Sequence, residues 1–141
     1  MGQDHFPLNI FLADDDIDDC QFFESTLAQV CQEAKLSIVH EGKALLELLS
    51  SKSFLPDLIV LDLNMPVMDG YDCMKNIKRN ENYKDIPVVI LTTSSYQAHI
   101  ERLASMGANL FLTKPQSYNE LKGIVQQIML VLGIPSYKVS V

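Results

Sequence analysis

The chain has 141 residues, about the size of one domain that can build a hydrophobic core without disulfides or structural metals. Its composition, 48% hydrophobic and 21% charged, is close to the globular average and excludes a disordered or fibrous chain. Eighteen acidic against eleven basic residues give a net charge of −7, which argues against non-specific binding to nucleic acid or to anionic lipid.

The sequence also indicates a location. No apolar run approaches the ~20 residues of a membrane-spanning helix, and residues 1–6 fit neither a signal peptide nor a myristoylation signal. Three cysteines are an odd number, and their spacing fits no zinc or CxxC pattern. We therefore expect a cytoplasmic protein with reduced thiols and no membrane partner.

Short apolar runs with β-strand character recur along the chain, at residues 9–13, 36–40, 58–61, 88–91 and 110–112. The first, third and fourth are nearly continuous in apolar residues, as expected of strands buried on both faces. The second alternates more with polar residues, so we expect it at an edge of the sheet.

Stretches with helical periodicity separate these runs, at residues 17–34, 43–52, 71–79, 96–106 and from a capping box at 117–120 to a stop at 133–135. We expect Asp16 to cap the first helix and Gly107 to end the fourth in a left-handed conformation. All six prolines fall at element boundaries, which supports this segmentation.

This alternation predicts an α/β fold with a parallel sheet and helices on both faces. For five strands and five helices the common solution is the flavodoxin-like, doubly wound order 2-1-3-4-5. No linker divides the sequence, so we expect a single domain over residues 1–141, with a core at about 8–132 and a short C-terminal tail at 134–141.

Polar side chains follow four of the predicted strands where each one ends, in segments 14–16, 62–64, 92–94 and 113–114. In such a sheet the ligand binds beyond the carboxyl ends of the strands, so these segments should converge on one site. The three histidines (His5, His40 and His99) are scattered, and we expect surface or edge positions for them rather than metal coordination.

The charges in these segments favour phosphoryl chemistry. Two carboxylates about 4 Å apart repel each other by about 4 kcal/mol at an effective dielectric of 20, and one lysine cannot neutralise three of them. Oxygen ligands with open positions suit Mg²⁺, while the Thr92 hydroxyl and the Lys114 ammonium suit phosphoryl oxygens. Asp62 is the best candidate nucleophile, and Asp14 and Asp15 are better placed as metal ligands.

Four sequence segments carry a resemblance to a known family. They are FLADD at 11–15, LIVLDLNMPVMDG at 58–70, PVVILT at 87–92 and the segment 107–115, which ends in FLTKP. Over residues 8–132 the chain resembles a receiver domain of a two-component response regulator. The type resembled is a stand-alone receiver, similar to chemotaxis regulators or, from the stretch 80–85, to phytochrome-associated single-domain regulators.

The resemblance implies a role for each acidic residue of the site. Asp62 is the phosphoacceptor, and Mg²⁺ is the cofactor. Asp15 and Asp62 bind the metal directly, Asp14 through water, and Asn64 through its backbone carbonyl. Three consecutive aspartates make the register ambiguous by one residue, and we assign Asp14 and Asp15 because residues 11–13 must complete the strand.

The resemblance also implies a switch. Thr92 and Lys114 bond the phosphoryl group, Lys114 preceding a proline that the family holds in the cis form. Thr92 moves inward on activation, and Phe111 follows as the switch aromatic. Phe111 lacks the hydroxyl group of a tyrosine, so an output that depends on a hydrogen bond from that hydroxyl is excluded.

We therefore expect a single-domain response regulator that is phosphorylated by a histidine kinase or phosphotransfer protein and signals by binding an unknown downstream protein. It would catalyse only its own phosphorylation and dephosphorylation and would not bind nucleic acid. The surface formed by segments 96–106, 110–112 and 117–133 would bind the downstream protein, and a homodimer would form through the same surface. The alternatives are a phosphohydrolase that acts on small phosphate esters through an aspartyl phosphate, and an interaction module that does not depend on phosphorylation.

Overall fold

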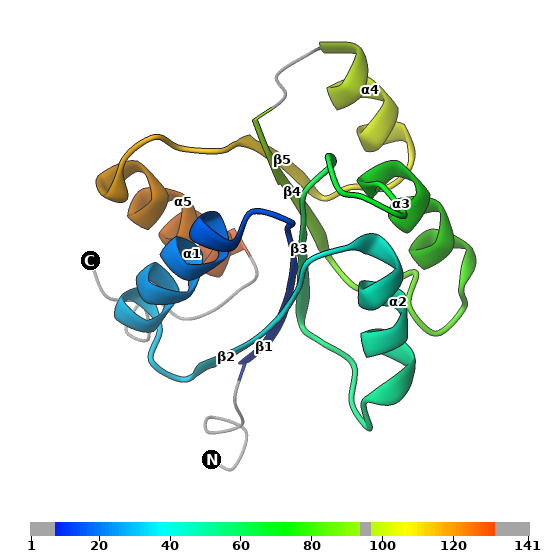
Figure 1. Ribbon diagram of the computed structural model, residues 1–141, viewed down its shortest axis with the longest axis horizontal. Coiled ribbons are helices and arrows are strands. Elements are labelled where there is room, and N and C mark those ends of the chain that lie inside the picture. The colour runs from blue at the N-terminus through cyan, green and yellow to red at the C-terminus, as the bar shows by residue number, and fades with distance from the viewer. Residues whose placement is uncertain (1–7, 94–96, 132–141) are drawn as a thin grey trace.

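The computed structural model describes residues 8–93 and 97–131 of the chain. Its elements are β1 (Leu8–Ala13), α1 (Ile17–Val30), β2 (Ala34–Val39), α2 (Gly42–Ser51), β3 (Leu58–Leu61), α3 (Gly70–Arg79), β4 (Val88–Thr92), α4 (Gln97–Ser105), β5 (Leu110–Thr113) and α5 (Tyr118–Val131). The sheet lies in the middle of the molecule, with α1 and α5 on one face and α2, α3 and α4 on the other (Figure 1).

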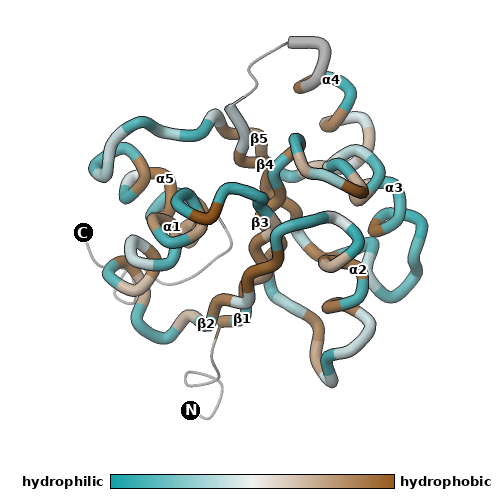
Figure 2. Tube along the Cα trace, in the orientation of Figure 1, coloured by the Kyte–Doolittle hydropathy of each residue, from teal (hydrophilic) through white to brown (hydrophobic). Residues whose placement is uncertain are grey.

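The five strands are parallel and follow the order β2-β1-β3-β4-β5, which confirms the predicted topology. Successive side chains of a strand point to opposite faces, so each strand contributes to two cores. In β1, Ile10 and Leu12 pack under α1 and α5, whereas Phe11 and Ala13 pack under α2 and α3. The hydrophobic colour of the central strands in Figure 2 reflects this burial on both faces.

The predicted first helix, 17–34, was too long, because α1 ends at Val30. Cys31 is already extended, with φ −145°, and Ala34 pairs with Leu8 of β1 as the first residue of β2. Ala34 continues the helical spacing in the sequence, but a full-length parallel partner for β1 outweighs that local preference. The edge position of β2 is as predicted, although the strand begins at Ala34 and not at residue 36, and most of its side chains are half-buried.

Three predicted helix caps are confirmed in the part of the chain that the structure describes. Asp16 caps α1 by accepting a hydrogen bond from the Asp19 N–H at 3.1 Å, and Gly107 has φ +103° after α4. In the capping box before α5, the Ser117 hydroxyl accepts from the Glu120 N–H at 3.2 Å. The predicted start of the fourth helix at residue 96, the stop at 133–135 and the tail 134–141 lie outside the described residues.

None of the helices within 8–93 and 97–131 is long and apolar enough to cross a membrane. The three cysteines are free and buried, as expected of reduced thiols.

Gly42, the first residue of α2, lies directly against the loop between β3 and α3. A Cβ at this position would overlap the Met68 carbonyl oxygen and the Cys73 sulfur. This loop begins directly after Asp62. The close approach of Gly42 therefore fixes the position of the loop relative to α2. By contrast, a Cβ on Gly123 of α5 would meet no heavy atom within 4 Å.

We therefore expect opposite effects from two matched substitutions. Gly42→Ala should lower the free energy of unfolding by about 2–3 kcal/mol, because the added methyl group forces packed atoms apart. Gly123→Ala should raise it by about 0.5–1 kcal/mol, because alanine is the better helix former. Urea unfolding followed by circular dichroism measures both values, and a neutral Gly42→Ala would show that the loop does not pack against α2 in this way.

Candidate functional site

Asp14, Asp15 and Asp62 form an acidic cluster at the carboxyl ends of β1 and β3. In the sheet, Ala13 pairs with Leu61, so the residues that follow them leave adjacent strands side by side. One carboxylate oxygen from each of the three aspartates lies within 4.8 Å of the others. Asp14 and Asp62 are buried, whereas Asp15 is exposed, so the cluster opens to solvent on one side.

Lys114, which follows β5, supplies the cation that faces this cluster. Its Nζ lies 2.8 Å from Asp14 Oδ2 and 3.7 Å from Asp62 Oδ2. The Lys114 N–H donates to the Thr92 carbonyl at 2.7 Å, which ties the loop after β5 to the end of β4. The predicted convergence of the carboxyl ends of β1, β3, β4 and β5 is therefore present.

Thr92 and Asn64 both contact Asp62 through hydrogen bonds. Thr92, the last residue of β4, is fully buried, and its side chain is hydrogen-bonded to the Asp62 carboxylate. The Asn64 backbone N–H also donates to this carboxylate. Two neutral donors and the more distant Lys114 ammonium therefore hold the Asp62 carboxylate.

Burial dominates the protonation of these groups. It raises the pKa of Asp14 to about 6, although the hydrogen bonds from Lys114 and from the Asp16 N–H act in the opposite direction. Burial likewise raises the pKa of Asp62, against the lowering effects of Lys114, Thr92 and Asn64. For Lys114, burial alone would lower the pKa, but the hydrogen bonds to Asp14 and Asp19 and the charge of Asp62 raise it overall, so this side chain stays a cation.

The donor set fits a hard divalent cation. Three carboxylates against one ammonium leave excess negative charge, and their oxygens lie close enough to share one ion. The exposed side at Asp15 leaves coordination positions for water or for further oxygen ligands. Such an open site suits Mg²⁺ or Mn²⁺, whereas a structural metal site is closed by protein ligands.

Phe111 lies outside the acidic cluster. It pairs with Ile90, two residues before Thr92, and its half-buried ring packs against the core under α2, α3 and α4. The Lys114–Pro115 peptide bond is trans, so the cis bond that the resemblance implied is not found.

Two residues near the cluster were not identified from the sequence as parts of the site. Asp19, in the first turn of α1, accepts a hydrogen bond from Lys114 Nζ at 2.8 Å. His40 is exposed, as expected, but its Nδ1 lies 3.0 Å from the Asp14 carbonyl oxygen. Asp19 is the third helical residue after the Asp16 cap, and side chains of the first turn point back toward the preceding strand end. This position in the first turn could have indicated Asp19 from the sequence. No pattern in the sequence indicated that His40 lies near Asp14.

Comparisons with known proteins agree with this geometry. The family model of the response regulator receiver domain matches residues 10–126. Response regulator Rcp1 of Synechocystis sp. is 33% identical over 127 residues, which covers 86% of this chain and 86% of Rcp1. The probable methanogenesis regulatory protein FilR2 of Methanothrix harundinacea is 32% identical over 126 residues, covering 86% of this chain and 81% of FilR2.

Solved structures of the same kind are similar in fold. The phosphorylated cyanobacterial phytochrome response regulator RcpA has a TM-score of 0.81 and 30% identity, over 87% of this chain and 91% of RcpA. The Mn²⁺-bound form of Rcp1 has a TM-score of 0.78 and 32% identity, over 87% of this chain and 92% of that one. The chain belongs to the response regulator receiver family of two-component signalling.

The raised pKa of Asp14 predicts how the stability of the metal-free protein depends on pH. Between its ordinary value of 3.8 and about 6, the folded state holds a proton that the unfolded state has lost, so the stability contributed by this group falls as the pH rises through that window. Asp14→Asn removes the buried charge. It should raise the free energy of unfolding at pH 7 by about 1–3 kcal/mol, and by less at pH 5.

Urea unfolding in EDTA at the two pH values measures this difference. Asp85→Asn, in the exposed loop between α3 and β4, is the matched control and should show no comparable gain at either pH. An Asp14→Asn gain of the same size at pH 5 and pH 7 would contradict burial of a charged carboxylate as its cause.

Proposed function

We propose that this chain is a phosphorylation-controlled switch in which Asp62 accepts a phosphoryl group from a phosphohistidine of a histidine kinase or phosphotransfer protein. The observation that carries the proposal is the convergence of Asp14, Asp15, Thr92 and Lys114 around the Asp62 carboxylate. Family membership supports it, because receiver domains belong to two-component signalling. We propose that the chain acts as one receiver domain over residues 1–141.

Mg²⁺ is the cofactor that the acidic cluster would take. The carboxylates of Asp14, Asp15 and Asp62 and the Asn64 backbone carbonyl would hold it, with Asp14 acting through water. When bound, the ion neutralises charge on the phosphoryl oxygens. The acidic cluster and the Mn²⁺-bound structure of Rcp1 support a divalent metal at this place.

In the transfer step, a carboxylate oxygen of Asp62 attacks the phosphorus atom of the phosphohistidine. The new P–O bond forms as the P–N bond breaks, and the imidazole leaves with the electron pair of that bond. The Lys114 ammonium and the Thr92 hydroxyl donate hydrogen bonds to phosphoryl oxygens, where negative charge must be stabilised. Hydrolysis of the aspartyl phosphate by water restores Asp62, so the protein catalyses only its own phosphorylation and dephosphorylation.

The readout of this switch depends on Thr92 and Phe111. Thr92 is hydrogen-bonded to Asp62, so a phosphoryl group there gives its hydroxyl a new acceptor. An inward movement of Thr92 lets the half-buried Phe111 ring follow, which changes the surface of α4, β5 and α5. We propose that this surface binds a downstream protein, not nucleic acid or membrane, and that it is also where a homodimer would form. Three free, buried thiols support a cytoplasmic location.

The first test is phosphorylation by a small donor. With acetyl phosphate and Mg²⁺, the mass of the intact protein should increase by one phosphoryl group, and EDTA should prevent the increase. Asp62→Asn should remain unlabelled, and Lys114→Ala should be labelled at least about 10-fold more slowly, because the developing charge loses its ammonium partner. Asp85→Asn is the control and should be labelled like the wild type.

The same experiment separates the alternatives. Release of many phosphate molecules per protein from phosphate esters would favour a phosphohydrolase. Labelling of Asp62→Asn at the wild-type level would contradict Asp62 as the acceptor, and a wild type that takes no phosphoryl group would favour an interaction module that does not depend on phosphorylation.

A further inference from the structure

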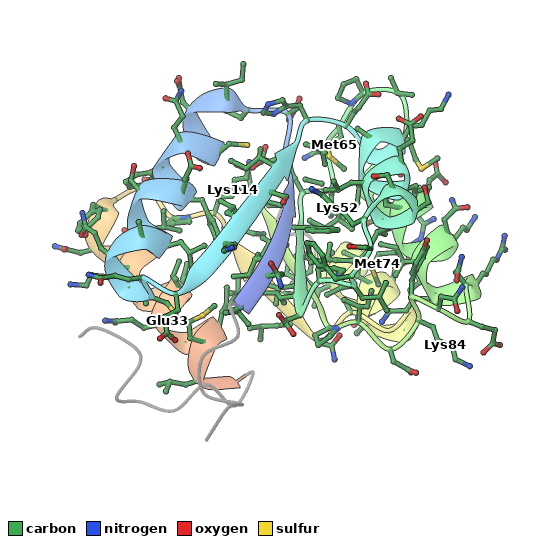
Figure 3. All side chains as sticks on the ribbon, turned by 90° about the horizontal axis from the view of Figure 1, so that it is seen from below. Glu33, Lys52, Met65, Met74, Lys84 and Lys114 are labelled. Carbon is green, nitrogen blue, oxygen red and sulfur yellow. The ribbon has the colours of Figure 1, made fainter. Side chains whose placement is uncertain are left out.

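Lys114 is shared among three carboxylates, and the proposed phosphoacceptor is the most distant of them. Its Nζ lies 2.8 Å from both Asp14 and Asp19, but 3.7 Å from Asp62. Figure 3 labels Lys114 beside α1, in agreement with its contact to Asp19. To make a hydrogen bond at the Asp62 side of the site, the ammonium must move toward Asp62 and give up part of its present contacts.

Asp19 is the partner that Lys114 can leave at the lowest cost. The Asp19 side chain is 42% exposed, so water can replace the lost ammonium. The Asp14 side chain is only 5% exposed, and a buried carboxylate without its cation is strongly destabilised. The Asp19 backbone is held in place by its N–H bond to Asp16, so its carboxylate stays near the position from which Lys114 departs.

Lys114 and Asp19 both line a small cavity. This cavity of about 20 Å³ lies between α1 and α5 and has room for about one water molecule. Its walls include Phe22 and Phe23 of α1 and Leu121 of α5, together with Asp19 and Lys114. The residues that line the cavity include Asp19 but not Asp62, so water can occupy it beside Asp19 when the ammonium moves toward Asp62.

We propose that Asp19 is a positioning residue that competes with the phosphoryl group at Asp62 for Lys114 and so slows phosphorylation. The inference rests on the proposed function, because it concerns the same site. While Lys114 bonds Asp19, part of its charge and one of its donors are directed away from the incoming phosphoryl group. Phosphorylation at Asp62 draws the ammonium across and leaves Asp19 to water at the start of α1.

The test compares two neighbouring acidic residues. Asp19→Asn should be phosphorylated by acetyl phosphate about 2- to 10-fold faster than the wild type at saturating Mg²⁺, the factor that corresponds to losing a half-exposed ion pair. Asp18→Asn, in the same first turn of α1, changes the net charge and the helix terminus in the same way and should stay within about 2-fold of the wild type. Asp19→Glu, which retains the carboxylate, should restore a rate close to that of the wild type.

A second measurement needs neither metal nor phosphodonor. A double-mutant cycle of Asp19→Asn and Lys114→Met, followed by urea unfolding in EDTA, should show a coupling of about 2- to 10-fold in the unfolding equilibrium constant. The same cycle with Asp18→Asn should show none.

The outcomes separate this inference from the proposed function. If the wild type is labelled but Asp19→Asn is no faster, or if Asp18→Asn accelerates labelling equally, competition by Asp19 is wrong and the proposed function stands. If the wild type itself takes no phosphoryl group, both fail. Absence of coupling in the Asp19 cycle would contradict the ion pair on which the inference is built.

Discussion

The site depends on one electrostatic constraint, the burial of two carboxylates side by side at the ends of neighbouring strands. Asp14 and Asp62 follow paired residues of β1 and β3, so the sheet register alone holds them together. Burial makes both harder to ionise, and a single ammonium, Lys114, offsets only part of their charge. A site with this charge imbalance is suited to gaining a further cation and, on the open side, an anionic group that brings its own oxygens.

The remainder of the fold makes this unfavourable arrangement tolerable. Two hydrophobic cores, one on each face of the sheet, hold the central strands in place and so keep the carboxylate oxygens within 4.8 Å of one another. The loops above the strands are tied by specific contacts: Lys114 to the end of β4, and the loop after β3 to α2 through Gly42. Phe111 and Asp19 lie outside the acidic cluster, and both are only partly buried. Burial is therefore nearly complete at Asp14 and Asp62 and incomplete at Phe111 and Asp19.

Sequence identity near 30% to Rcp1, RcpA and FilR2 shows the family of the chain. The contacts at the start of α1 show how its own residues are arranged within that fold. Its third consecutive aspartate, Asp16, caps α1 and orients the first turn. That turn places Asp19 on Lys114, which gives the lysine an exposed partner besides the buried Asp14. The Lys114 ammonium therefore contacts a carboxylate from α1 as well as those at the strand ends. It lies 2.8 Å from Asp14 and Asp19 but 3.7 Å from Asp62.

The sequence by itself determined the order of the elements, because apolar runs and helical spacing are local properties. It also determined which residues lie together at the site, because parallel strands end on one edge of the sheet. Asp14, Asp62, Thr92 and Lys114 were found in this way. Only the tertiary structure decided where α1 stops, since the pairing of Ala34 with Leu8 joins residues far apart in sequence. It also decided that Lys114 bonds Asp19 and lies farther from Asp62. The position of Asp19 in the first turn of α1 indicates only a direction, whereas the distances depend on how the helix packs across the sheet, which local residue spacing does not specify.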